Sequence, residues 1–421
     1  MTRLLFKQFL NDDLGCASYL VGDEHAGVAV VVDPPYFVEP VLAEAERHGV
    51  PIRVHRAAEA TFAHEPLEDG TEVEVGDVVL RTIHTPGHRP EHCCFAVIDR
   101  SRSDEPWLVL TGDSLFVGDA GRPDLAVEAR EGAEGLFNSL RRLVELGDGV
   151  EVFPGHVAGS LCGAAMSSKT STTIGYERRS NPALEGELAD FLAARLGPQP
   201  PRPPNMERIV ELNRGELLGA QPQVTRIDSM PQEAVVVDVR PTDAFAAGHH
   251  RGAVGIPVSG SSFATRAAFV LPERPVVLHA ADEDEAVRAA RSLHTVALFA
   301  TAGWQQGGGS EKLEPVSLEE LEHLLANDAV ELLDVREADE RDEGHIPGSQ
   351  HLPYRTARAA AEAGLLNGRP VVTICESGPR AAIAASVLQA AGVDARPVLD
   401  GGITEWRARG GETTCVRRCG S

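Results

Sequence analysis

The chain has 421 residues, 43% of them hydrophobic and 24% charged, which is the composition of ordinary globular domains and enough length for about two to four of them. The formal net charge of −24 argues against nucleic acid as a partner, because phosphate binding requires a basic surface. Seven scattered cysteines without a Cys-x-x-Cys pair argue against a disulfide framework. No apolar run is long enough to span a membrane, and no signal-peptide pattern begins the chain, so we expect a cytoplasmic protein without membrane contact.

The first part of the chain alternates apolar strands with polar loops. We expect a buried strand over 27–35, an amphipathic helix over 38–50, and a hairpin-like run over 71–88 that ends in the polar loop TPGH. The segments WLVLTGDSLF (107–116) and EVFPGH (151–156) have the same form, an apolar strand that ends in charged or histidine residues. Strands that deliver Asp and His at their C-terminal ends are typical of an αββα metal-binding sandwich.

Two segments interrupt the pattern of elements. The proline-rich spacer GPQPPRPPN (197–205) cannot continue a helix or enter a sheet interior, and QQGGGSE (305–311) is a flexible glycine run. They predict three domains, over residues 1–196, 207–304 and 313–421.

The second and third of these pieces are repeats of each other. Residues 235–257 and 331–353 share Asp-Val-Arg, Gly-His, Gly and Pro at a constant offset. Each piece alternates short β-branched runs with alanine-rich helical stretches, a pattern that predicts a parallel sheet with crossover helices. Two copies indicate a duplication rather than a solenoid.

The segment ICESGPRAA (374–382) places Cys375 directly after an apolar strand and directly before a helix. We expect the backbone N–H groups of the loop to surround the sulfur, and the positive end of the following helix favours a thiolate there. Arg380 closes the loop, and its planar fork is suited to an anionic donor group. The other residues of this persulfide loop are Glu376, Ser377, Gly378 and Pro379.

The length of this loop separates two chemistries. Cysteine-dependent phosphatases place five residues between Cys and Arg and normally carry a histidine before the cysteine. Here four residues separate Cys375 from Arg380, and Ile374 precedes the cysteine. The smaller ring favours a sulfur atom over a phosphate. The alternative is a buried cysteine at a strand end that serves only packing.

Residues 313–415 resemble a rhodanese domain through LLDVRE (332–337), GHIPGSQHLP (344–353), the CESGPR loop and LDGGITEW (399–406). The resemblance implies that Cys375 accepts sulfur from thiosulfate or a persulfide and passes it to a thiol acceptor. It also implies mainly structural roles for Asp334, Arg336 and His345.

Residues 207–304 resemble a second rhodanese domain. Aligning the two repeats places Ala280 where Cys375 stands and Glu285 where Arg380 stands. Without a cysteine this copy forms no persulfide, and its acidic loop HAADEDEA repels anionic donors. We expect it to serve packing or linking.

Residues 1–180 resemble the metallo-β-lactamase fold, and more closely its persulfide dioxygenase branch, through HTPGHRPEH (84–92), TGDSLFVGDAGRPDL (111–125) and FPGHVAG (153–159). In that branch one iron, held by two histidines and an aspartate, oxidises a persulfide to sulfite. The resemblance implies His88 and Asp113 as ligands of Fe(II), with Zn as the alternative metal. His156 matches a histidine that lies beside the metal.

The first metal ligand of that family comes from a His-x-His-x-Asp-His loop, and no His-x-His occurs among the fifteen histidines of this chain. The chain passes from Val50 directly to PIRVHRAAEATFAHEPLEDG, where the family normally inserts a strand, the metal loop and a helix. The expected fold is therefore α/β: an αββα metallo-β-lactamase-like sandwich that lacks the metal-loop segment, followed by two rhodanese-like parallel-sheet domains.

Further residues follow from the same resemblance. Cys162 is either a sulfur relay or a packing residue, and polar side chains of the substrate-side segments are candidate substrate contacts. The candidate contacts are Arg122, Lys169, Tyr176 and Arg178.

Together the patterns predict an enzyme of sulfane-sulfur metabolism. Its partners are a small persulfide or thiosulfate and a thiol acceptor such as glutathione, and the sequence leaves a homo-oligomer open. Two alternatives remain for the N-terminal domain, a metal-free binding or docking module and a thioester hydrolase of the glyoxalase II kind.

Overall fold

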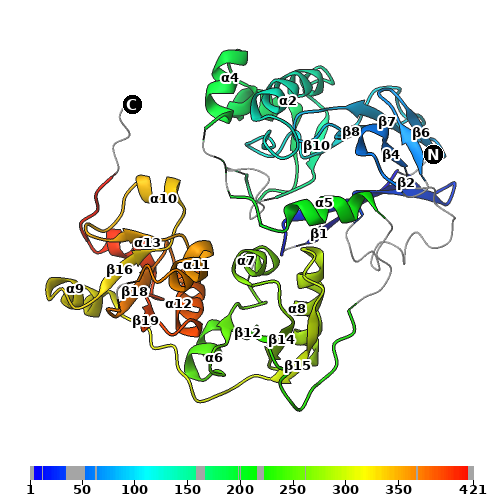
Figure 1. Cartoon of the computed structure of the whole chain (residues 1–421). Helices are drawn as coiled ribbons and strands as arrows, with labels where there is room; N and C mark the ends of the chain where they lie inside the picture. Colours follow the sequence, from blue (N-terminus) through cyan, green and yellow to red (C-terminus); the bar gives the residue numbers. More distant parts are fainter. Residues whose placement is uncertain are drawn as a thin grey trace. The chain divides into compact units, whose positions relative to one another are not determined.

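The computed structural model describes residues 4–11, 13–34, 53–61, 64–157, 166–197, 199, 201–215, 222–260, 262–366 and 368–415. The chain forms two compact units, Met1–Ala220 and Gln221–Ser421 (Figure 1). Within the described ranges, no helix is both long enough and apolar enough to cross a membrane.

Unit 1 contains two sheets and a short parallel strand pair. The antiparallel three-stranded sheet has the order β1 (Leu4–Asn11), β2 (Cys16–Asp23) and β3 (Val28–Val32). The six-stranded sheet has the order β11 (Thr172–Thr173), β10 (Glu151–Pro154), β9 (Leu108–Gly112), β8 (Cys93–Asp99), β7 (Val78–His84) and β6 (Glu72–Val75). The pair consists of β4 (Arg53–His55) and β5 (Glu65–Leu67).

Three helices of unit 1 pack on one face of the six-stranded sheet: α2 (Ala129–Val144), α3 (Ile174–Ser180) and α4 (Leu188–Arg195), with a 3-10 turn at Pro182–Leu184. A second 3-10 turn, Arg56–Ala58, follows β4, and α5 (Met206–Arg214) lies apart from the other helices (Figure 1). Leu136 and Leu140 of α2 share a buried cluster with Ile83 and Val109 of the sheet. On the other face, Tyr19 of β2 packs in a cluster with sheet residues. Alternate strand side chains thus bury both faces of the central sheet.

Two sequence predictions for unit 1 have clear outcomes. The hairpin predicted over 71–88 is confirmed, because β6 and β7 pair in antiparallel register. The strand predicted as buried over 27–35 forms as β3, but only Val32 is buried, since β3 is an edge strand that pairs with β2 alone. The helix predicted over 38–50 lies outside the described residues.

Unit 2 contains two parallel four-stranded sheets with the same order of strands, as the internal repeat predicts. The first is β13 (Val254–Gly255), β12 (Val235–Asp238), β14 (Val276–Ala280) and β15 (Thr301–Gln306). The second is β17 (Gln350–His351), β16 (Glu331–Asp334), β18 (Val371–Ile374) and β19 (Ala395–Pro397). The predicted combination of an N-terminal β-sandwich and parallel α/β repeats is confirmed.

Each sheet of unit 2 is accompanied by helices that connect its strands. The first repeat contains α6 (Thr242–Ala247), α7 (Phe263–Val270) and α8 (Glu283–Thr295). The second contains α9 (Leu318–Ala326), α10 (Ala338–Asp342), the 3-10 turn Tyr354–Thr356, α11 (Ala357–Glu362), α12 (Pro379–Ala390) and α13 (Gly402–Ala408).

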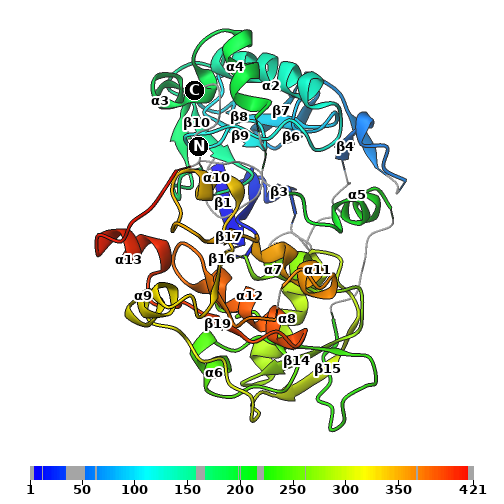
Figure 2. The same cartoon turned by 60° about the vertical axis from the view of Figure 1, so that its left-hand side comes forward.

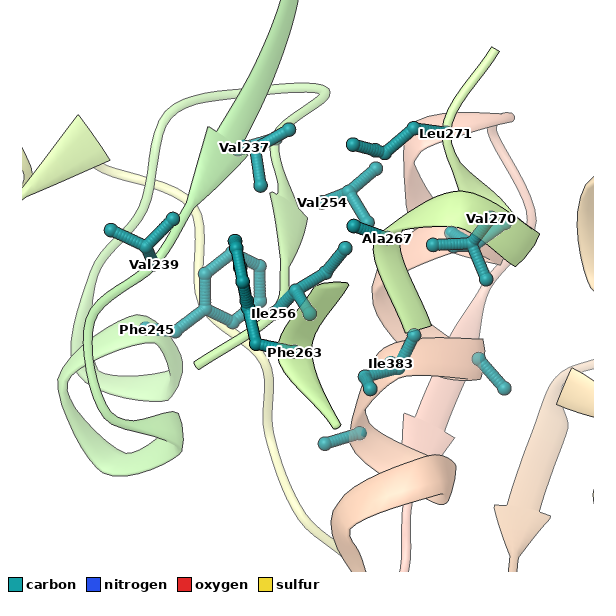
Figure 3. Close-up of a cluster of buried hydrophobic side chains, with 14 of the residues drawn as sticks. Val237, Val239, Phe245, Val254, Ile256, Phe263, Ala267, Val270, Leu271 and Ile383 are labelled. Atoms are coloured by element: carbon teal, nitrogen blue, oxygen red, sulfur yellow. The ribbon is translucent and has the colours of Figure 1, made fainter. Parts of the chain in front are cut away.

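The helix that follows Cys375 is buried between the two repeats. α12 contacts β18 and β19 of its own repeat and β13 of the other. Figure 2 shows α12 beside β19. Every residue from Ala381 to Leu388 is buried, and Ile383 packs among the apolar side chains of the first repeat (Figure 3). Alanine makes this possible because its small side chain lets a helix approach neighbours on several sides. The first repeat therefore helps to hold the helix that begins at the Cys375 loop.

Two segments near the predicted boundaries are ordered by contacts. α5, at the start of the middle piece, belongs to unit 1, where the N–H of Thr61 donates to the carbonyl of Arg214. In the glycine run 305–311, the first residues belong to β15, and Glu311 and His249 exchange two backbone hydrogen bonds. This run is therefore anchored at both ends.

Candidate functional site

The Cys375 loop has the strand-to-helix geometry that the sequence predicts. β18 ends at Ile374, α12 begins at Pro379, and Cys375 between them is only 1% exposed. The N–H of Gly378 donates to the Cys375 sulfur over 3.1 Å, with Gly378 at a φ of 108° that favours glycine. This hydrogen bond stabilises a thiolate in an otherwise buried position.

The GGIT segment holds the backbone of this loop from the other side. The N–H groups of Ile403 and Thr404 donate to the carbonyls of Cys375 and Glu376, over 2.9 and 3.2 Å. Gly402 has a φ of 52°, and a Cβ there would lie 2.1 Å from the Cys375 carbonyl oxygen. Only glycine permits this close approach, which fixes the turn that carries the cysteine.

Arg380 has a partner that the sequence did not reveal. Its two terminal nitrogens donate to the two carboxylate oxygens of Glu340 in α10, each over 2.6 Å. Burial lowers the pKa of Arg380, but the hydrogen bonds and charge of Glu340 outweigh burial and raise it. The fork expected to receive an anionic donor is thus already filled by a carboxylate of the chain. No local pattern could reveal this, because Glu340 stands 40 residues upstream in a segment that looks like an ordinary charged helix.

A buried ion pair stabilises the Cys375 loop through a hydrogen bond to Glu376. Arg336 and Asp334 are 1% and 0% exposed, and the Arg336 guanidinium donates twice to the Asp334 carboxylate, over 3.0 and 2.8 Å. The same guanidinium donates to Glu376 over 2.8 Å and to the carbonyl of Gly344 over 2.7 Å. This arrangement agrees with the structural role expected for both residues and links the loop to β16.

The first repeat has the same frame without the nucleophile. In the first repeat, Asp238 of β12 lies opposite His279 of β14, just as Asp334 of β16 lies opposite Ile374 of β18 in the second repeat. Ala280, the residue after His279, therefore occupies the position of Cys375. The Glu285 carboxylate accepts from the N–H of Ala281 over 2.7 Å. In this copy a carboxylate of the chain therefore binds a backbone N–H of the loop that corresponds to the Cys375 loop.

In unit 1 the structure brings together the three residues predicted for the metal site. The Asp113 carboxylate contacts His156 Nδ1 through Oδ1 at 2.5 Å and His88 Nε2 through Oδ2 at 3.1 Å. Burial raises the pKa of Asp113, but the charges and hydrogen bonds of His156 and His88 outweigh burial and hold it well below its usual range. His88 Nδ1 lies 3.0 Å from the carbonyl oxygen of Arg122, which orients the ring.

His92, which no sequence pattern singled out as functional, positions Asp113. Its Nε2 accepts from the Asp113 backbone N–H over 2.8 Å, and its Nδ1 lies 2.8 Å from the Thr85 hydroxyl. Burial, followed by the charge of His88, lowers the pKa of His92 to about 4. A Cβ at Gly112, where φ is 47°, would lie 2.5 Å from this ring. The glycine of the TGD motif therefore makes room for the imidazole that fixes its aspartate.

These residues do not fit the metal that the resemblance implies. A bound iron or zinc ion needs donor atoms that converge on one point. Here the two imidazoles contact opposite oxygens of Asp113. Among the described residues, no group of three or more His, Cys, Asp or Glu side chains is arranged to hold a metal ion. The chain also contains no His-x-His that could supply the missing donor.

A cysteine that the sequence did not single out lies beside this group. Cys16, at the start of β2, has its sulfur 3.2 Å from His156 Nε2. The two residues are 140 positions apart and meet through an isolated antiparallel bridge between their backbones. No local pattern links them, which is why the sequence did not reveal the contact.

The remaining candidates are the proposed substrate contacts and the proposed sulfur relay. The Arg122 guanidinium is buried and pairs with Asp124 at 2.7 Å, and Arg178 pairs with Asp148 at 2.6 Å. Lys169 is exposed, Tyr176 is 56% exposed on α3, and Cys162 lies outside the described residues.

Comparison with known proteins identifies both regions of the chain. The family described as "Metallo-beta-lactamase superfamily" matches residues 25–156, and "Rhodanese-like domain" matches residues 317–409. The hydroxyacylglutathione hydrolase GloC of Haemophilus influenzae is 30% identical over 180 residues, which cover 42% of this chain and 72% of that protein. The mitochondrial persulfide dioxygenase ETHE1 of Bos taurus is 28% identical over 148 residues, 35% of this chain and 52% of that protein.

A solved structure extends the similarity beyond unit 1. A metallo-beta-lactamase from Staphylococcus aureus subsp. aureus COL matches with a TM-score of 0.64 and 25% identity, over 72% of this chain and 99% of that one. Unit 1 makes up 220 of the 421 residues, so the match includes part of unit 2. The chain therefore belongs to the metallo-beta-lactamase superfamily and carries a rhodanese-like domain over residues 317–409.

Proposed function

We propose that the chain is a sulfurtransferase that carries sulfane sulfur on Cys375 and passes it to a small thiol. The observation that supports this proposal most strongly is the buried Cys375 sulfur, which accepts the N–H of Gly378 at the start of α12. The rhodanese-like domain supports sulfurtransferase activity in general. We propose a thiol persulfide as the sulfur donor and a thiol such as glutathione as the acceptor.

The transfer needs two displacements. The Cys375 thiolate attacks the sulfane sulfur of the donor, an S–S bond forms at Sγ, and the donor thiolate leaves with the electron pair of the broken S–S bond. An acceptor thiolate then attacks the outer sulfur, and Cys375 leaves as the thiolate. The Gly378 N–H and the positive end of α12 stabilise the negative charge that develops at the loop in both steps.

The Arg380–Glu340 pair favours a thiol persulfide over thiosulfate as the donor. Thiosulfate is a dianion, and its binding needs a cation that is not already neutralised. Arg380 is neutralised by Glu340, and Arg336 by Asp334 and Glu376. A persulfide carries its sulfane sulfur without a sulfonate and does not depend on this guanidinium.

Replacing Glu340 with glutamine is expected to lower the KM for thiosulfate about tenfold, because it releases the Arg380 fork for the sulfonate. Glutamine retains an oxygen for the Glu337 N–H that Glu340 accepts in α10. Thiocyanate formation from thiosulfate and cyanide measures the effect. Glu337→Gln is the matched control, because Glu337 pairs with Arg355 instead. An unchanged KM in Glu340→Gln, or an equal fall in the control, would contradict the assignment.

Sulfur transfer is expected to be unaffected by chelation. The Cys375 loop uses a backbone N–H, a helix end and ion pairs. Protein treated with a strong chelator and desalted should transfer sulfur from glutathione persulfide to cyanide at the untreated rate. A loss of this activity that added iron or zinc restores would show that the transfer itself depends on metal.

Unit 1 raises a second question, since its relatives include a persulfide dioxygenase and a hydroxyacylglutathione hydrolase by name. Both relatives suggest that unit 1 receives a small thiol derivative. We propose that it binds a thiol persulfide without oxidising it, because the donor set at Asp113 does not fit a metal. Iron analysis after expression with iron, paired with O₂ uptake on glutathione persulfide, is expected to show well under one iron per chain and no uptake.

A further inference from the structure

Three side chains of unit 1 have the geometry of a nucleophile, a base and an orienting carboxylate. The Cys16 sulfur lies 3.2 Å from Nε2 of His156, and Nδ1 of the same ring lies 2.5 Å from Oδ1 of Asp113. Because a carboxylate accepts, Nδ1 donates to Asp113. The tautomer that this bond selects turns the lone pair of Nε2 toward the thiol.

The backbone holds Cys16 and His156 against each other. The N–H of Ala17 donates to the carbonyl of Gly155 over 2.7 Å, and the N–H of Val157 donates to that of Gly15 over 2.9 Å. These two hydrogen bonds flank the pair on both sides. The contact is therefore set by an isolated backbone bridge between the start of β2 and the segment that follows β10, and not by two flexible side chains alone.

The other two members are fixed as well. The ring of Phe116 meets the His156 ring edge-on, with centroids 6.4 Å apart. Asp113 is fixed by the His92 contact to its backbone N–H and by His88 at its second oxygen. Cys16 itself is partly exposed. Such a set generates a nucleophilic sulfur without a metal.

We infer that Cys16 is a second sulfur-accepting nucleophile, with His156 as its base and Asp113 as the residue that positions His156. The class of substrate, a low-molecular-weight thiol persulfide, rests on the proposed function. In the step, the Cys16 thiol gives its proton to His156 and its sulfur attacks the outer sulfur of R–S–SH. The S–S bond of the donor breaks, RS⁻ leaves with the electron pair and takes the proton from His156, and Cys16 becomes a persulfide.

The charges around the thiol favour a persulfide over thiosulfate. The carboxylate of Asp113 lies 2.5 Å from Nδ1 of His156, on the side of the ring away from the thiol, and its negative charge repels a dianion. Arg122, the arginine of the segment that follows the TGD motif, is paired with Asp124. A thiol persulfide, which also exists as the neutral R–S–SH, does not meet this repulsion.

The test uses the full chain with Cys375→Ser, so that sulfur on Cys375 does not interfere. This protein, kept in chelator, is mixed with glutathione persulfide, alkylated at timed intervals, digested and analysed by peptide mass spectrometry. We expect one added sulfur atom on Cys16. His156→Gln should slow its appearance by about 10²-fold, the usual contribution of a general base. Cys93, partly exposed in the same unit, is the internal control and should gain sulfur far more slowly than Cys16.

Asp113→Asn provides a second variant if His156→Gln alters the fold, which circular dichroism and the thermal midpoint report. It keeps the side-chain shape and should also slow the reaction of Cys16. The inference is wrong if Cys16 gains no sulfur, or gains it equally fast in both folded variants. Sulfur on Cys375 of the wild-type chain together with none on Cys16 would reject this inference alone. The reverse result would reject the proposed role of Cys375 alone.

Discussion

Cys375→Ser is expected to lower sulfur transfer from glutathione persulfide to cyanide by at least about 10³-fold, because the nucleophile of covalent catalysis is removed. Serine is only slightly smaller than cysteine, and its hydroxyl oxygen can still accept the N–H of Gly378. The loop should therefore keep its fold. A hydroxyl in this position does not form a persulfide. Steady-state thiocyanate formation measures the loss, and the KM of the residual activity shows whether another site produces it.

Cys415→Ser is the matched control for this substitution. Cys415 is exposed, and its sulfur lies 3.1 Å from the carbonyl oxygen of Glu343, whereas the sulfur of Cys375 accepts the N–H of Gly378. Its replacement should leave the rate unchanged. Equal losses in the two variants, or full activity in Cys375→Ser, would place the sulfur carrier elsewhere.

Asp334→Asn is expected to destabilise unit 2 by about 3–5 kcal/mol, the cost of removing one partner of a buried ion pair. Asp334 accepts from Arg336 through both oxygens and also from Arg341, and it is fully buried. Asparagine offers one acceptor oxygen and no charge, so the buried guanidinium loses much of its compensation. Native-state hydrogen exchange of peptides from β18 and α12 measures the change.

Asp328→Asn is the same substitution in an exposed pair. Asp328 and Arg369 lie 2.9 Å apart, with side chains 89% and 40% exposed, so the change should cost at most about 1 kcal/mol. If both substitutions altered exchange equally, burial of the Asp334–Arg336 pair would not be what stabilises the loop. The loop would then depend on Gly402 and its neighbours alone.

The sequence predicted those parts of the fold that local patterns encode. The strand, loop and helix around Cys375 follow from an apolar run, a Gly-Pro pair and an alanine-rich stretch that all lie between Val371 and Ala390. The repeat predicted two parallel sheets of the same order, because identical patterns fold alike. His88, Asp113 and His156 were predicted to meet through the family resemblance, not through their spacing, and the structure brings them together.

What the sequence could not predict depends on contacts between distant segments. Glu340 reaches Arg380 only because α10 packs beside the loop, and nothing in EADERDEG distinguishes this carboxylate from its solvated neighbours. Cys16 reaches His156 only because an isolated backbone bridge joins the start of β2 to the segment after β10, 140 residues along the chain. The burial of α12 between both repeats likewise depends on how the two sheets meet.

The first repeat has a clear structural consequence for the second. It lacks the cysteine, yet it buries the face of α12 that its own sheet does not cover, through Ile383 and its neighbours. Ser386 of α12 also links the two repeats, because its hydroxyl oxygen accepts the N–H of Gly255 over 3.1 Å. Because α12 begins at the Cys375 loop, a copy without chemistry still contributes to the geometry of the copy that has it.

The central claim is that Cys375 carries the transferred sulfur, and peptide mass spectrometry after a single turnover tests it most directly. The wild-type chain is mixed with one equivalent of glutathione persulfide in the absence of acceptor, alkylated and digested. We predict one added sulfur atom on the peptide that contains Cys375, and its loss when cyanide is added, with thiocyanate formed in equal amount. Thiocyanate formation at the full rate without sulfur ever appearing on Cys375 would contradict the claim.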